Sequence, residues 1–201
     1  MQGPLLALIV VAAYAALHSL LASVAAKARA RAALGPVADR VYRLAFNLVA
    51  VVTFLPVMAV PALDPGRTLY IVPWPWSAVM VAAQIAAALV VLAGLLQTDP
   101  WHFLGLRQLA DDATGAPPTL VTTGLYRHVR HPLYTAGAVF LWLTPIMTTT
   151  LLALYAALTA YLYLGTLHEE RRLRAEFGEA YVAYQRRVPR LIPRVGRSRA
   201  G

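Results

Sequence analysis

Four long stretches of the chain carry no charged side chain, and they constrain the fold more than any other feature. They are residues 1–26, 44–63, 68–98 and 132–167. About 20 apolar residues cross the hydrocarbon core of a bilayer as a helix. Across the 201 residues, 59% are apolar and only 13% are charged, whereas an ordinary soluble domain has about 25% charged residues. The sequence therefore argues against a soluble globular enzyme and predicts an all-α integral membrane protein.

The last stretch is too long for one span. It has 36 residues, and a single helix of that length would measure ~54 Å against a hydrocarbon core of ~30 Å. Because Thr144-Pro145 and residues 148–150 interrupt its middle, we expect a tight hairpin of two short helices. The prediction is a bundle of about five transmembrane helices. Three lie in an N-terminal region (residues 1–96), the third at about residues 77–96. The hairpin and a cytoplasmic amphipathic C-terminal helix lie in residues 97–201.

Basic residues fall almost entirely on one side of these spans. Seventeen of the 18 lie in the loop after the first span, in the loop after the third, or in the tail from His168 onward, and only Arg67 lies on the other side. Loops rich in Lys and Arg stay in the cytoplasm. We therefore expect the N-terminus outside, the C-terminus in the cytoplasm, and the chain in a bacterial inner membrane, with the first span an uncleaved anchor. The net charge of +9 then indicates topology and contact with membrane lipids rather than with nucleic acid.

The first polar segment that could carry chemistry is residues 122–134. Pro132 suits the first turn of a helix, so the fourth span is expected to begin there, with its free N–H groups near Arg127, Arg130 and His131. A helix N-terminus flanked by arginines can bind a carboxylate or a phosphate. The alternative is an ordinary basic flank beside lipid head groups. Cysteine is absent, so there are no thiolate nucleophiles or thiolate metal ligands, and no metal site is predicted.

The second segment is His168-Glu169-Glu170, directly after the fifth span. Apolar residues then recur at spacings of four, four, three and four, which predicts an amphipathic helix through Leu173, Phe177, Tyr181, Tyr184 and Val188. Glu170 falls inside the apolar arc of this helix, and Glu169 falls just beyond its edge. A carboxylate in an apolar stripe at membrane level must bind a ligand or pair with a cation. The candidate cations are Arg127, Arg130 and Arg172.

These segments together resemble the C-terminal half of the integral-membrane methyltransferases, which include isoprenylcysteine carboxyl methyltransferases and phospholipid N-methyltransferases. The resemblance covers about 75 residues and rests on Gly124-x-Tyr126, Arg130-His131-Pro132-x-Tyr134, Gly137, Glu169-Glu170, Phe177-Gly178, Tyr181-x-x-Tyr184 and Val188-Pro189-x-x-Ile192-Pro193. Within that superfamily, residues 142–148 and the segment from Asp99 to Gln108 are most similar to the methanethiol S-methyltransferase branch. Residues 18–23 are similar to the NnrU family.

The resemblance implies methyl transfer from S-adenosylmethionine to a small or lipophilic acceptor, above all a thiol, at the cytoplasmic face. Transfer to a prenylcysteine-like carboxylate or to a lipid amine is an alternative. Two other classes stay open: an NnrU-like haem-binding isomerase, which would need histidines facing His18 within the spans, and a lipid-binding scaffold without enzymatic activity.

The same resemblance implies that the Arg-His-Pro-x-Tyr segment and the Glu-Glu pair enclose the cofactor. Its carboxylate suits Arg130 and His131, and its cationic and hydroxyl groups suit the two glutamates and aromatic faces. Glu170 and His131 are the candidate catalytic bases. The expected cofactor-binding residues are Tyr126, Arg127, Arg130, His131, Tyr134, Glu169, Glu170 and Tyr181.

The one-sided charge distribution yields a first prediction. A reporter that is active only in the cytoplasm, fused after Gly201, should be active, because 17 of the 18 basic residues lie on the side of the C-terminus. A reporter that is active only in the periplasm should stay silent at the same position. Activity of the periplasmic reporter would contradict the arrangement of five spans.

Overall fold

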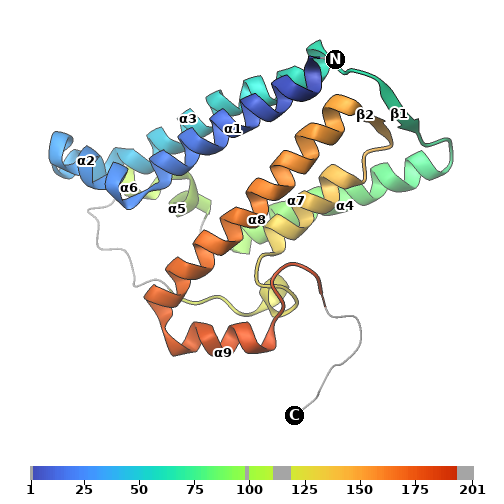
Figure 1. Cartoon of the computed structure of the whole chain (residues 1–201). Coiled ribbons are helices and arrows are strands. Elements are labelled where there is room, and N and C mark those ends of the chain that lie inside the picture. Colours follow the sequence, from blue (N-terminus) through green and yellow to red (C-terminus); the bar gives the residue numbers. More distant parts are fainter. Residues whose placement is uncertain (1, 98–99, 111–118, 194–201) are drawn as a thin grey trace. The chain divides into compact units, whose positions relative to one another are not determined.

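The computed structural model describes residues 2–97, 100–110 and 119–193 (Figure 1). Within these residues, four helices are long and apolar enough to cross a membrane: α1 (Gly3–Ala22), α3 (Pro36–Leu63), α4 (Trp76–Gln97) and α8 (Thr149–Phe177). A shorter apolar helix, α7 (Pro132–Trp142), precedes α8. The predicted all-α membrane bundle is confirmed, with four long apolar helices and one short one. Asp99, used in the comparison with thiol methyltransferases, lies outside the described residues.

The long helices leave large apolar side chains exposed. Leu5 of α1, Leu55 of α3 and Leu89 of α4 are 61%, 61% and 59% exposed, respectively. Such exposure is unfavourable in water but favourable against lipid chains, because hydrocarbon solvates apolar side chains while the helix satisfies its own backbone groups. The apolar surfaces of these helices are therefore those of membrane-spanning segments.

The chain divides into two compact units, each built from segments that are separated in the sequence. The first comprises Met1–Pro73, Leu96–Ala116 and Pro145–Leu158, and the second comprises Trp74–Leu95, Pro117–Thr144 and Thr159–Gly201. Helix α8 contributes its first part to one unit and its second part to the other. The division expected from the sequence, into an N-terminal membrane region (residues 1–96) and a second region (residues 97–201), stays a prediction.

In the first unit, α1 and α3 lie side by side along their length (Figure 1). Between them the ring of Phe54 lies 5.2 Å from that of Tyr14, and the ring of Phe46 lies 4.8 Å from that of His18. After α1, the side chain of Ser23 accepts a hydrogen bond from the N–H of Ala26 and so begins α2 (Val24–Leu34). Two short helices, α5 (Pro100–Leu104) and α6 (Arg107–Ala110), also contact α3.

A small sheet in the first unit was not predicted. Strand β1 (Thr68–Ile71) pairs antiparallel with β2 (Ile146–Thr148), which connects α7 to α8. Strands of three and four residues are too short to show an alternating pattern in the sequence. The expected interruption after Thr144-Pro145 is therefore a short strand as well as a turn.

The second unit contains α4, α7 and the second part of α8. The hairpin forms as expected: the indole N–H of Trp142 at the end of α7 donates to Thr159 of α8 (2.9 Å). The side chain of Gln84 joins α4 to α7 through the carbonyl of Phe140 (2.9 Å). The expectation of two short helices is wrong for α8, which has 29 residues. It continues past the apolar stretch because its charged Glu and Arg residues are good helix formers.

The C-terminal amphipathic segment is broken rather than continuous. Helix α8 ends at Phe177, and α9 (Glu179–Arg187) starts after Gly178, whose φ is +54°. The N–H of Gly178 donates to the carbonyl of Arg174 (3.0 Å), a glycine cap that ends a helix. A single helix over this segment was therefore a wrong prediction. The chain changes direction at Gly178, and α9 runs at an angle to α8 (Figure 1).

Candidate functional site

The second unit brings together three segments that are far apart in the sequence. Arg130 and His131 precede Pro132, which occupies the first turn of α7 as predicted. Glu169 and Glu170 lie near the end of α8. The third segment is residues 188–191, called here the C-terminal strap, which follows α9. All three segments meet around one buried carboxylate.

Glu170 is that carboxylate, and its side chain is only 3% exposed. Oε1 accepts from Nε of Arg130 and from Nε of Arg190 (2.8 and 3.1 Å), and Nη2 of Arg130 forms an ion pair with it at 2.7 Å. Oε2 accepts from Nη2 of Arg190 and from the amide of Gln185 (2.8 and 2.9 Å). Each carboxylate oxygen has about two lone-pair sites. Two guanidinium groups and one amide therefore use the hydrogen-bonding capacity of Glu170.

The C-terminal strap is bound to the start of α7 mainly through its backbone. The N–H groups of Arg130 and His131 donate to the carbonyls of Pro189 and Arg190 (2.9 and 3.1 Å). The hydroxyl of Thr135 donates to the carbonyl of Leu191 (2.8 Å), and Nη1 of Arg130 donates to the carbonyl of Val188. The N–H groups of Arg130 and His131 thus bind the strap. Arg130 is the centre of the packing because it joins α7, α8 and the strap.

His131 lies between the two glutamates. Its Nε2 is 3.2 Å from Oε1 of Glu170, and its Nδ1 is 3.4 Å from Oε2 of Glu169. The imidazole is buried, and its ring meets that of Tyr134 edge-on at 5.5 Å. These contacts fix the ring, so His131 holds Glu169 beside the buried cluster.

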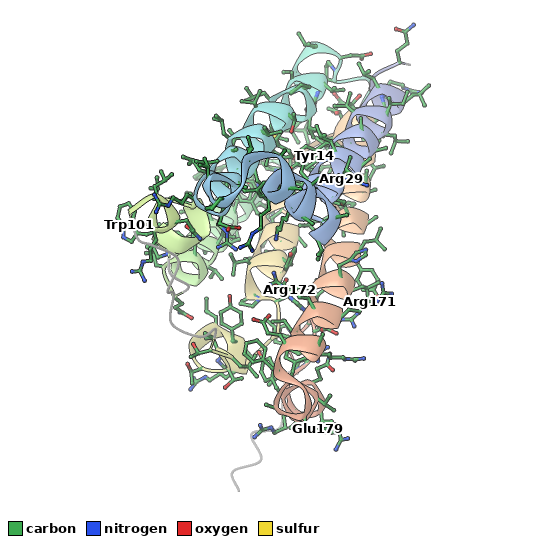
Figure 2. All side chains as sticks on the ribbon, turned by 90° about the vertical axis from the view of Figure 1, so that its left-hand side faces the viewer. Tyr14, Arg29, Trp101, Arg171, Arg172 and Glu179 are labelled. Carbon is green, nitrogen blue, oxygen red and sulfur yellow. The ribbon has the colours of Figure 1, made fainter. Side chains whose placement is uncertain are left out.

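Glu169 differs from Glu170 because it keeps an open side. Its side chain is 34% exposed, against 3% for Glu170. Besides His131, the hydroxyl of Tyr134 hydrogen-bonds to it. A partly exposed carboxylate with a fixed position and acceptor capacity to spare can bind a cation or a pair of hydroxyl groups. Of the two glutamates, Glu169 is the one accessible to a ligand. Arg171 and Arg172 follow the two glutamates on α8, and Glu179 is the first residue of α9 (Figure 2).

Tyr181 provides a second feature that points to a ligand. Tyr181 is only 1% exposed, and its hydroxyl is buried beside the guanidinium of Arg130, with no acceptor for its own proton among the described residues. Burial, followed by the negative charge of Glu170, raises the pKa of Tyr181 to about 12. The phenol is therefore protonated at neutral pH and can donate. Its neighbour Tyr184 is different, because the hydroxyl of Tyr184 donates to the backbone carbonyl of Tyr126 (2.6 Å).

Most residues expected at the site gather in this unit, but two outcomes were not foreseen. Arg127, in the 3₁₀ helix η1 (Gly124–Arg127), is exposed and donates to His128 (2.9 Å). Sequence reasoning missed Arg190 and Gln185, both of which bind Glu170. The available signal for Arg190 was its position between Pro189 and Ile192-Pro193. The cation expected opposite Glu170 was Arg127, Arg130 or Arg172, and Arg130 is the one that pairs with it.

Comparisons with known proteins agree with the resemblance seen in the sequence. A family model described as phospholipid methyltransferase matches residues 81–180. Methanethiol S-methyltransferase from Crocosphaera subtropica is 35% identical over 111 residues, which cover 54% of this chain and 44% of that protein. Methanethiol S-methyltransferase 2 from Bradyrhizobium diazoefficiens is 39% identical over 110 residues, 53% of this chain and 42% of that protein. The chain thus spans less than half the length of these curated relatives. No solved structure matches.

The contacts of Glu170 predict unequal roles for the two glutamates in stability. Glu170→Gln should destabilise the protein by about 2–3 kcal/mol, below the range for a fully buried pair, because it leaves the guanidinium groups of Arg130 and Arg190 (10% and 27% exposed) facing each other without their carboxylate. Glu169→Gln, the matched control one residue away, should change stability little because its side chain is partly exposed. Thermal unfolding of the purified protein in detergent, followed by tryptophan fluorescence, measures both. Equal shifts for the two variants would show that Glu170 does not hold the cluster together.

Proposed function

We propose that this chain, which belongs to the membrane methyltransferase superfamily through residues 81–180, transfers a methyl group from S-adenosylmethionine to a small or lipophilic acceptor. The observation that carries the proposal is the cluster in the second unit, where the Arg-His-Pro-x-Tyr segment and the Glu-Glu pair meet and leave Glu169 partly exposed. The site faces the cytoplasm in the orientation expected from the basic loops.

The residues present fit this cofactor. S-adenosylmethionine supplies a methyl group on a sulfonium centre, which becomes neutral when a nucleophile attacks in line. Glu169 offers a fixed carboxylate for the ammonium group or the ribose hydroxyls, and the buried hydroxyl of Tyr181 offers an unused donor. The ring of Tyr134 beside Glu169 can face a cation. These three residues are the proposed contacts with the cofactor.

The other predicted residues have supporting roles in this proposal. Arg130 is already bound to Glu170 and to carbonyls of residues 185 and 188. It can bind the cofactor's carboxylate with its full guanidinium group only by releasing these partners. We therefore assign Arg130 and Glu170 to positioning, and we leave exposed Arg127 as the candidate for the carboxylate. Tyr126 lies at the edge of the site, where its backbone carbonyl accepts a hydrogen bond from the hydroxyl of Tyr184.

A thiol is the proposed acceptor. The matched relatives are named for methanethiol, and a thiolate is a strong nucleophile that needs alignment and a dry site more than further activation. An amine acceptor would require a base. His131 is buried between two carboxylates, and Glu170 is fully hydrogen-bonded, so both are poorly placed to take a proton from a substrate. Transfer of a labelled methyl group to a volatile thiol rather than to a lipid amine or a prenylcysteine carboxylate tests this choice.

Calorimetric titration tests the role of Glu169. Wild-type protein should bind S-adenosylmethionine and its demethylated product. Glu169→Gln should weaken binding about tenfold to a hundredfold, the range expected for losing a hydrogen bond to a charged group. Glu176→Gln, at an exposed carboxylate on the same helix, is the matched control and should bind normally. Unchanged affinity in Glu169→Gln would contradict the proposed contact, and absence of binding by the wild type would contradict the proposed function.

Removal of single hydroxyl groups tests the role of Tyr181. Tyr181→Phe should change stability little, since it removes a buried hydroxyl whose proton has no acceptor among the described residues, while cofactor affinity falls several-fold. Tyr184→Phe should lower stability by about 1 kcal/mol because it breaks the hydrogen bond to Tyr126. Thermal unfolding and titration of both variants give the comparison. Loss of stability in Tyr181→Phe without loss of affinity would assign its hydroxyl a structural role instead.

A further inference from the structure

A cavity of about 190 Å³ lies in the first unit, where α2, the start of α3 and α6 meet. It is lined by Lys27, Ala38, Asp39, Tyr42, Arg43 and Gln108. Tyr42 is fixed by the hydrogen bond from its hydroxyl to the carbonyl of Leu21 (2.6 Å). The volume corresponds to about six water molecules at the density of the liquid. It is large enough for a phosphate group with its ester carbons.

The charges around this cavity favour an anion. Lys27 and Arg43 line it from two different helices, and the only acid among these lining residues, Asp39, forms an ion pair with Arg31 (3.4 Å). The same three helical segments also carry Arg29, Arg40 and Arg107. Six basic side chains thus accompany one acidic side chain on these described segments of the first unit. A concave site lined by one sign of charge concentrates counter-ions more than an ordinary basic flank does.

The position of the cavity along the chain sets its depth in the membrane. Arg43 immediately precedes the uncharged stretch 44–63 of α3, and Lys27 follows the uncharged stretch that forms α1. Both residues therefore lie where apolar helix gives way to charged sequence, at the level of lipid head groups. The phosphate of an anionic lipid head group is a ligand of the right charge at this level of the membrane.

We propose that this cavity binds the phosphate-containing head group of an anionic phospholipid. Lys27 of α2 and Arg43 of α3 hold the phosphate from two sides. Basic pockets at the ends of membrane helices bind anionic head groups, and each Lys or Arg near the membrane surface adds to the attraction. The site belongs to the first unit and does not depend on the methyl-transfer proposal.

Native mass spectrometry of the purified full chain, titrated with phosphatidylglycerol, tests this site. Two matched pairs of variants each remove one positive charge from the same helix: Lys27→Gln against Arg29→Gln on α2 (Arg29 is labelled in Figure 2), and Arg43→Gln against Arg40→Gln on α3. We expect Lys27→Gln and Arg43→Gln to weaken lipid binding about fivefold or more each, and the two controls, whose side chains do not line the cavity, to weaken it clearly less. Lys27→Arg and Arg43→Lys keep the charge and should keep the affinity.

Four results would overturn the proposal. Equal losses in the lining variants and in their controls would indicate general attraction to the basic surface rather than a site. Equal affinity for phosphatidylcholine, which carries no net charge, would show that the anion is not recognised. Displacement of phosphatidylglycerol by a similar concentration of inorganic phosphate would identify a site for the free ion instead of a lipid. If a glutamine variant fails to fold, loss of binding in the charge-conserving variants would decide against the site.

Discussion

The carboxylate of Glu170, bound between the guanidinium groups of Arg130 and Arg190, holds the second unit together. Burying an ionised carboxylate is costly unless hydrogen bonds and opposite charges compensate for the lost water. Here the compensating groups are Arg130 at the start of α7, and Gln185 and Arg190, which both follow the break at Gly178. The charge can be accommodated only when the three segments have met. The arrangement of α7, α8 and the C-terminal strap therefore depends on this one interaction.

This constraint separates the functions of two adjacent, chemically identical residues. Successive positions on a helix point about 100° apart, so neighbouring glutamates face different surroundings. Glu170 is buried against Arg130 and Arg190, whereas Glu169 faces His131 and Tyr134 and keeps a third of its side chain exposed. The buried member fixes the geometry, and this fixed geometry positions the exposed member for a ligand. In the proposed methyltransferase, alignment of cofactor and acceptor is the main requirement, and a rigid carboxylate serves it.

The features that could be predicted from the sequence are local ones. The apolar helices follow from uncharged stretches, the start of α7 follows from Pro132, and the burial of Glu170 follows from its phase relative to Leu173 and Phe177. The failures involve tertiary contacts. The regular spacing of apolar residues continues across Gly178, so it indicated one helix although the glycine ends α8. The pairing of Glu170 with Arg190 depends on the path of the chain after that break, which periodicity does not encode.

An experimental structure of the protein with the demethylated cofactor bound would test the central claim most directly. The account predicts a carboxylate oxygen of Glu169 within hydrogen-bonding distance of the ligand, while Glu170 stays bound to Arg130 and Arg190. A structure in which Glu170 contacts the ligand, or in which Arg130 leaves Glu170 to bind the ligand's carboxylate, would contradict it.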